Sequence, residues 1–240
     1  MHHWVLMPVL NEAKGLPGWM RLIGSALNNE DTTFVISDDG STDGISETLI
    51  GQANFPKYVL LGDGINRGPG AAFAKGFEYI FQHGSAGDAV ITLESDGTAD
   101  VSSLKPMLEA LNANDVALAS VYLPGGGFTR TDWGRLMLSN AANTFTRFAL
   151  NLPYRTLTSF YRAYRFEALQ KLSVQFPKII EESGFTCQVE LLYKCRIANL
   201  SITEIVTKVF SDRRIGSSKM KVVRTIREHL RFVFKTRFKR

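Results

Sequence analysis

Two apolar runs of this 240-residue chain end abruptly in carboxylates, and this feature constrains the fold more than any other. Residues 35–39 read Val-Ile-Ser-Asp-Asp, and residues 90–96 read Val-Ile-Thr-Leu-Glu-Ser-Asp. An apolar run of this length, bounded by turn residues, is typical of a buried strand in a parallel sheet. Open α/β sheets bind ligands at the carboxyl ends of such strands. The two runs therefore predict an acid-rich sheet edge that suits a nucleotide together with a divalent cation.

Strands and helices are expected to alternate along the first half of the chain. Apolar runs predict strands at residues 4–9, 33–38, 58–61, 89–93 and 116–120, with a helical pattern between each pair. Beyond residue 120 we expect helices at about 132–150 and 185–198 and a strand at 201–209. This order predicts an α/β fold with a mostly parallel central sheet flanked by helices. Residues 121–218 are interpreted as an elaboration of the same domain, so 1–218 form one unit.

The last 22 residues carry most of the positive charge. The net charge is +5, and residues 219–240 hold nine Lys or Arg and one Glu, so the rest of the chain is mildly acidic. Val223, Ile226, Leu230 and Val233 form an apolar stripe among these cations. This pattern predicts a basic amphipathic helix on an anionic membrane surface. The alternative is a helix packed on the core with a solvated basic face; nucleic acid is not expected, because the basic charge is confined to one helix.

The composition predicts a cytoplasmic protein. No apolar run is long enough for a transmembrane helix, and the first residues lack the charged and apolar regions of a signal peptide. Only two cysteines are present, so no disulfide framework is indicated. With the basic tail, we expect a peripheral position on the cytoplasmic face of a membrane.

Glu94-Ser95-Asp96 is the motif that best predicts a metal. Side chains two apart on an extended chain share a side, and two close carboxylates suit a hard cation with oxygen ligands. Mg²⁺ or Mn²⁺ bound there would neutralise a diphosphate leaving group. The alternative is a solvated loop. Asp39 likewise either accepts hydrogen bonds from a base or ribose or simply serves the turn at 38–43.

Glycine and arginine segments supply weaker signals. In Asn66-Arg67-Gly68-Pro69-Gly70, the glycines favour a tight turn and close helix packing over a phosphate loop, because the established phosphate-loop spacings are missing. Arginines at 130, 135, 155, 162 and 165, and the run from Asp212 to Lys219, suit phosphate recognition. Each cluster alone is equally consistent with a solvated surface.

The order of these motifs resembles the family 2 glycosyltransferases with the GT-A fold. The residues that carry the resemblance are Pro8-Val9-Leu10-Asn11-Glu12, Asp38–Asp43, Asn66-x-Gly68-x-Gly70 and Glu94-Ser95-Asp96-Gly97. In the second half, the segment 158–165, Gln188-x-Glu190 and Arg213-x-x-Gly216-x-Ser218-Lys219 resemble dolichol-phosphate mannose synthases and related polyprenyl-phosphate glycosyltransferases. The resemblance covers about residues 4–220.

The resemblance implies roles for particular residues. Residues 1–120 become the nucleotide-binding half and 121–218 the acceptor-side half. The expected nucleotide-sugar contacts are Pro8, Leu10, Glu12, Asp39, Glu94, Ser95 and Asp96. The expected metal ligand is Asp96, with Thr98 near the metal. Catalytic roles fall to Asp96, Arg135, Arg213 and Lys219, the last two at the donor diphosphate. Acceptor-phosphate contacts fall to Arg135, Ser139 and Arg162.

Three functional hypotheses follow. The first is an inverting transfer of a hexose from GDP-mannose or a UDP-sugar to a polyprenyl or dolichyl phosphate, with a separate membrane-anchor protein as a further partner. The second is a transferase acting on a sugar or small-molecule hydroxyl, with Glu181, Glu182 or Glu190 as the base. The third is a silent nucleotide-sugar-binding subunit, suggested by Glu94, Val121 and Thr156 at positions where the family usually has Asp, Arg and Asp.

Overall fold

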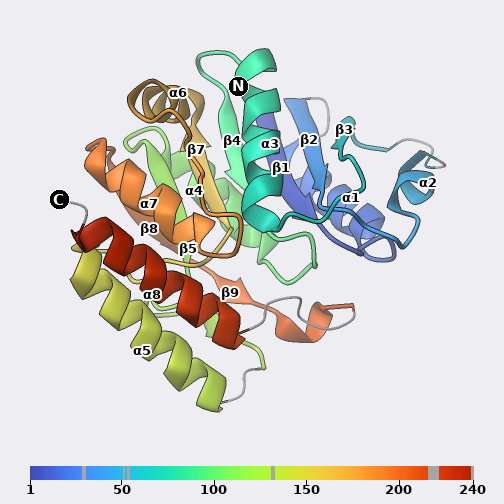
Figure 1. Cartoon of the computed structure of the whole chain (residues 1–240). Coiled ribbons are helices and arrows are strands. Elements are labelled where there is room, and N and C mark those ends of the chain that lie inside the picture. Colours follow the sequence, from blue (N-terminus) through green and yellow to red (C-terminus); the bar gives the residue numbers. More distant parts are fainter. Residues whose placement is uncertain (29–30, 51, 53–54, 131–132, 216–221, 239–240) are drawn as a thin grey trace.

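A seven-stranded sheet forms the centre of the computed structural model, which describes residues 1–28, 31–50, 52, 55–130, 133–215 and 222–238 (Figure 1). Its order is β3-β2-β1-β4-β7-β5-β8. The strands are β1 (His3–Val9), β2 (Thr32–Asp38), β3 (Tyr58–Leu61), β4 (Ala89–Thr92), β5 (Val116–Ser120), β7 (Arg162–Arg165) and β8 (Ile202–Val206). All neighbours are parallel except the two pairs that β7 makes, which confirms the expected mostly parallel sheet.

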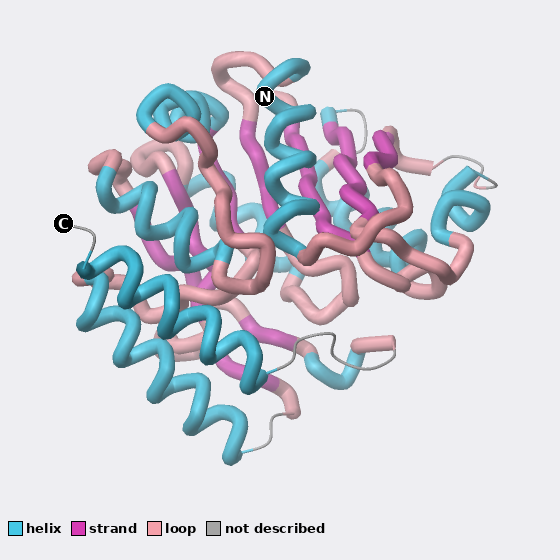
Figure 2. The backbone as a smooth tube through the Cα atoms, in the orientation of Figure 1, coloured by secondary structure: helices cyan, strands magenta, loops and turns pink. Residues whose placement is uncertain are grey.

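Helices cover both faces of this sheet, as the tube view shows (Figure 2). They are α1 (Leu16–Leu27), α2 (Ile45–Ile50), α3 (Pro69–His83), α4 (Leu104–Ala110), α5 (Trp133–Leu150), α6 (Phe166–Gln175), α7 (Cys187–Ile197) and α8 (Val222–Phe238), with short 3-10 turns at Val101–Ser103 and Ser211–Arg213. Successive residues of β1 point to opposite faces. Leu6 therefore joins the core cluster under α3 and α7, whereas Val5 joins the cluster under α1 and α4.

Strand β7 was not expected from the sequence, in which residues 157–165 look only aromatic and basic. It lies antiparallel between β4 and β5, pairing Thr92 with Arg162 on one side and Leu118 with Arg162 on the other. Strands β4 and β5 follow each other in the chain, but β7 lies between them in the sheet. Residues from the segment 121–218 therefore contribute strands to the same sheet as residues 1–120.

Strand β9 (Lys208–Val209) and helices α5 and α8 lie below the sheet in Figure 1. Strands β6 (Gly127–Phe128) and β9 form a separate parallel pair. Helix α8 lies beside α5. Phe232 and Val233 of α8 are buried in a core cluster, and the Phe232 ring meets Tyr193 edge-on at 6.3 Å between centroids. Val233 belongs to the stripe expected to face a membrane, so at this position the alternative of packing on the core holds, because α8 buries it against the protein.

None of the helices within the described residues is long and apolar enough to cross a membrane. Residues 216–221 and 239–240 lie outside the described residues.

Candidate active site

The carboxyl ends of β1, β2 and β4 meet at one edge, because the register places Val9 beside Asp38 and Leu6 beside Thr92. Side chains then fix the loops that follow these strands. The Ser95 hydroxyl donates to the Pro8 carbonyl at 3.0 Å. The Trp19 indole donates to the Glu94 carbonyl at 3.1 Å. Two of the expected nucleotide contacts, Pro8 and Ser95, are thereby brought together.

The loop after β1 is equally constrained. Asn11 adopts a positive φ of 54° and accepts the Thr42 amide on its side-chain oxygen at 2.8 Å. The Glu12 carbonyl accepts the amides of Gly15 and Leu16, which begins α1. Leu10 and Glu12 remain partly exposed at this edge. Their roles at a nucleotide stay predictions.

Asp39 accepts hydrogen bonds from two backbone amides at the start of α3. Its carboxylate accepts the amides of Arg67 and Gly68 at 2.7–3.0 Å, and the side chain is buried. Burial raises its pKa, although both amides oppose that change. Asp39 therefore connects the end of β2 to the start of α3. Its role at a nucleotide stays a prediction.

Glu94 points toward the segment that precedes β7. Its carboxylate accepts the amide of Phe160 at 3.1 Å. Burial, and then the negative charge of Asp96, raises the pKa of Glu94 to about 7. The extra methylene relative to Asp lets Glu94 reach the segment before β7. Phe160 supplies both that amide and a ring that stacks on Phe185 with centroids 5.6 Å apart.

Asp96 carries the densest set of contacts at the edge. Its Oδ1 accepts the Thr98 amide at 3.1 Å and the Thr98 hydroxyl at 2.7 Å. Its Oδ2 accepts two nitrogens of Arg214, Nε at 2.8 Å and Nη2 at 2.5 Å. Thr98 thus lies beside Asp96 as a hydrogen-bond donor, and the expected place of Thr98 near a metal stays a prediction. Arg214 was not singled out from the sequence.

Arg213, the arginine expected at the donor diphosphate, stacks on an aromatic ring. Its guanidinium carbon lies 3.8 Å from the centroid of the Phe210 ring. Lys219 lies outside the described residues. The backbone of Arg135 and Ser139 belongs to α5, and their side chains lie outside the described part of the chain. The roles of these four residues stay predictions.

Arg162 contradicts its expected place near the acceptor phosphate. It is 1% exposed, and its guanidinium donates to the carbonyls of Leu157 at 2.7 Å and Gln188 at 2.9 Å. The strand β7 directs this side chain into the core, where it joins the segment before β7 to α7. Arg162 is a structural cation, held by carbonyl oxygens.

The acids proposed as a base for a hydroxyl acceptor form another structural unit. Glu190 is 2% exposed and accepts the amides of Glu181 and Glu182 at 2.8–3.0 Å. Lys194 donates to the same carboxylate at 2.6 Å. A carboxylate engaged in this way holds the 181–184 loop, which disfavours Glu190 as a catalytic base.

The surroundings of the Asp96 carboxylate suit a divalent cation. Mg²⁺ and Mn²⁺ commonly bind one or two protein carboxylates and complete their shells with water and substrate phosphates. The Oδ2 atom of Asp96 already faces a positive group, and the side chain is 15% exposed. Among the described residues no cluster of three or more acids, histidines or cysteines could hold a metal unaided. Asp96 therefore suits a cation that arrives with a phosphate ligand.

Comparison with known proteins agrees with this architecture. The model of the family described as Glycosyl transferase family 2 matches residues 4–173. A polyprenol monophosphomannose synthase of Mycolicibacterium smegmatis is 30% identical over 219 residues, covering 90% of this chain and 80% of that protein. An undecaprenyl-phosphate mannosyltransferase of Micrococcus luteus is 28% identical over 216 residues, covering 90% of this chain and 86% of that protein.

A solved structure shows the same fold at lower identity. The glucosyl-3-phosphoglycerate synthase of Mycobacterium tuberculosis, crystallised with Mn²⁺ and UDP-glucose, superposes with a TM-score of 0.66 and 16% identity, over 98% of this chain and 78% of that one. The match supports the GT-A architecture of this chain.

Proposed function

The chain belongs to glycosyltransferase family 2, and from this premise we propose that it transfers a hexose from a nucleotide diphosphate sugar to a polyprenyl phosphate with inversion at the anomeric carbon. The observation that carries the proposal is Asp96 at the carboxyl edge of the sheet, in contact with a basic segment from 118 residues away. Relatives that span nine-tenths of the chain are mannosyltransferases named for polyprenyl-phosphate products or acceptors.

The proposed phosphate acceptor does not need a protein carboxylate as a base. A phosphate oxygen is anionic near neutral pH, so it attacks the anomeric carbon without a strong base. The new bond joins the anomeric carbon to a phosphate oxygen of the acceptor; the bond from that carbon to the donor diphosphate oxygen breaks, and its electron pair leaves with the nucleoside diphosphate. Catalysis then rests on positioning and on stabilising the departing negative charge. The engagement of Glu190 with backbone amides favours this acceptor over a hydroxyl, which needs a base.

Each residue at the edge has a task in this scheme. Pro8, Leu10, Glu12 and Ser95 line the nucleotide side, and Glu94 links that side to the segment at Phe160. Arg213 and Lys219 offset charge on the donor diphosphate, and Arg135 and Ser139 lie toward the acceptor phosphate. A divalent cation held by Asp96 supplies further positive charge to the diphosphate when bound.

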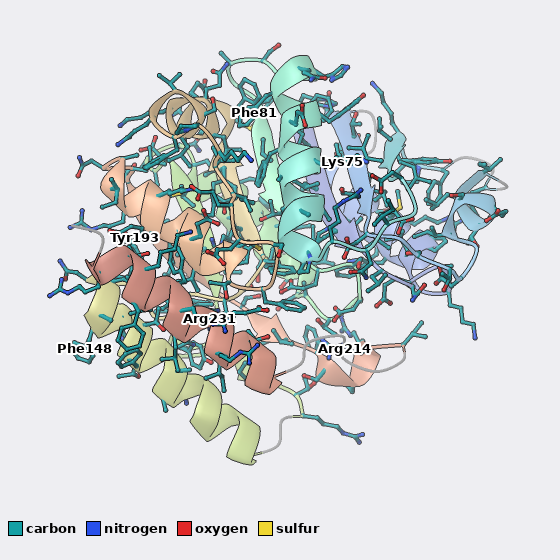
Figure 3. The ribbon with its side chains drawn as sticks, viewed as in Figure 1. Lys75, Phe81, Phe148, Tyr193, Arg214 and Arg231 are labelled. Carbon is teal, nitrogen blue, oxygen red and sulfur yellow. The ribbon has the colours of Figure 1, made fainter. Side chains whose placement is uncertain are left out.

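The exposed surface of helices α5 and α8, called the α5–α8 face, supports a peripheral position on a membrane, where a polyprenyl acceptor lies. It exposes Phe145 (46%), Phe148 (84%), Leu230 (38%) and Phe234 (53%). Arg227, Arg231, Lys235 and Arg237 are exposed on α8, and Figure 3 shows Phe148 and Arg231 on these two helices. Exposed aromatic rings with adjacent cations favour the headgroup region of an anionic bilayer.

Flotation with phosphatidylglycerol-containing vesicles tests this position. Phe148→Ser combined with Phe234→Ser should reduce recovery with the vesicles, because both rings face outward. Val174→Ser is the matched control, since Val174 is 88% exposed on α6, away from this face. Equal recovery of the double variant and the wild type would remove the face from the proposal. Point variants are preferred to truncation, because deleting α8 would uncover the buried Phe232 and Val233.

A donor screen tests the reaction. Radiolabelled GDP- and UDP-sugars are incubated with polyprenyl phosphate and Mg²⁺ or Mn²⁺, and label in the lipid fraction is counted. We expect product with at least one donor, lost in Asp96→Asn. Asp31→Asn is the control, because exposed Asp31 precedes β2 at the opposite end of that strand. No lipid-linked label with any donor would refute the proposal.

A further inference from the structure

The ion pair between Arg214 and Asp96 occupies the carboxylate oxygen that a cation would need. Both Arg214 nitrogens converge on Oδ2, while Thr98 takes Oδ1. Both oxygens of Asp96 are therefore already engaged. The pair is partly shielded, with side-chain exposures of 31% for Arg214 and 15% for Asp96.

Three contacts bring this distant arginine to the edge. Val209 forms an antiparallel bridge with Ala99. The Phe210 amide donates to the Thr98 carbonyl at 2.8 Å, and the Arg213 amide donates to the Phe210 carbonyl at 2.9 Å. The segment is thus held along residues 98–99 up to its last turn, and Arg214 is the next residue (Figure 3).

We propose that Arg214 holds Asp96 in the donor-free protein and must release Oδ2 when a divalent cation binds there. This inference rests on the proposed role of Asp96 as a cation ligand. A guanidinium and a divalent cation repel each other at one oxygen, so the two compete for it. Release frees a planar, bidentate phosphate-binding group beside Arg213. Arg214 therefore couples cation binding to the segment that carries the expected diphosphate contacts.

The neighbouring arginine provides a matched control. Arg213→Gln removes the same charge one residue away, but Arg213 stacks on Phe210 and does not contact Asp96 among the described interactions. The probe is Mn²⁺ alone, titrated into the full chain and followed by the loss of the free-ion electron paramagnetic resonance signal. Arg214→Gln should tighten Mn²⁺ binding about twofold to fivefold, the range expected for losing a partly exposed competing pair. Arg213→Gln should change it less than about twofold, and Arg214→Lys should return toward the wild type.

A second readout follows the arginine itself. Trypsin cleaves after Arg214 more readily once the side chain leaves Asp96. Mn²⁺ should therefore accelerate this cut in the wild type, whereas in Asp96→Asn the cut should be fast with or without Mn²⁺.

The possible results distinguish failure of this inference from failure of the proposed function. Equal effects of the two glutamine variants would overturn the competition and leave the metal site standing. Mn²⁺ affinity unchanged in Asp96→Asn would refute both the ligand role of Asp96 and the competition. Binding seen only in Arg214→Gln would support the inference, and no binding by any variant would overturn it. The transfer assay with the wild type is independent of all these results.

Discussion

Replacing Gly70 by alanine tests how tightly the start of α3 is packed. A Cβ at this position would lie 1.9 Å from the Glu182 carbonyl oxygen and 3.0 Å from the Cys187 Cβ. The Gly70 amide also donates to the Ser183 carbonyl at 2.7 Å. The nearest obstacle is backbone, so the 181–184 loop has to move and this hydrogen bond is weakened.

The magnitude follows from three contributions. Overpacking of this kind costs about 1–3 kcal/mol. Weakening the backbone hydrogen bond costs about 1 kcal/mol more. The higher helix propensity of alanine returns up to about 1 kcal/mol. We therefore expect a net loss of about 1–3 kcal/mol, which lowers Tm by roughly 2–12 °C for a domain of this size.

Thermal and urea unfolding followed by circular dichroism measure this loss. Gly18→Ala is the control, because Gly18 lies in α1 with nothing within 4 Å of the added Cβ. That variant should gain about 0.5–1 kcal/mol from propensity alone. A Gly70→Ala protein as stable as the wild type would refute the packing of α3 against the loop.

Two further predictions concern buried carboxylates. Because the pKa of Glu94 is raised from 4.5 to about 7, the folded state binds more protons than the unfolded state between these values, and stability falls as pH rises through this range. Glu94→Gln should therefore gain relative to the wild type by at most about 3 kcal/mol between pH 4.5 and pH 8 in urea unfolding; a pH-independent difference would contradict the assigned environment. Lys194→Met should lose about 3 kcal/mol, because it leaves the Glu190 carboxylate buried without its cation. Adding Glu190→Gln should recover part of that loss, and unchanged stability of the single variant would disprove the pairing.

The sheet was predictable where side-chain pattern alone decides the structure. The apolar runs at 4–9, 33–38, 89–93 and 116–120 correspond to β1, β2, β4 and β5 within a residue or two. Strand β7 was not predicted, because Arg-Ala-Tyr-Arg has charged ends. The buried guanidinium of Arg162 donates hydrogen bonds to carbonyls of residues 157 and 188. That environment arises from tertiary contacts, which local periodicity does not report.

The site was predictable as an edge but not as a set of partners. The apolar run and its acids located Glu94 and Asp96 correctly at the end of a strand. An aspartate after a strand, however, serves a ligand or a backbone amide equally well, and the glycine-rich start of α3 supplied the amides for Asp39. Likewise, spacing does not tell which of two adjacent arginines reaches across 118 residues to Asp96.

The mass of the lipid recovered after reaction tests the central claim most directly. Wild-type protein, a nucleotide diphosphate hexose and polyprenyl phosphate should give a lipid heavier by one hexosyl group, and Asp96→Asn should give none. An unmodified lipid with every donor, or a hexosyl lipid formed equally well by Asp96→Asn, would contradict the claim.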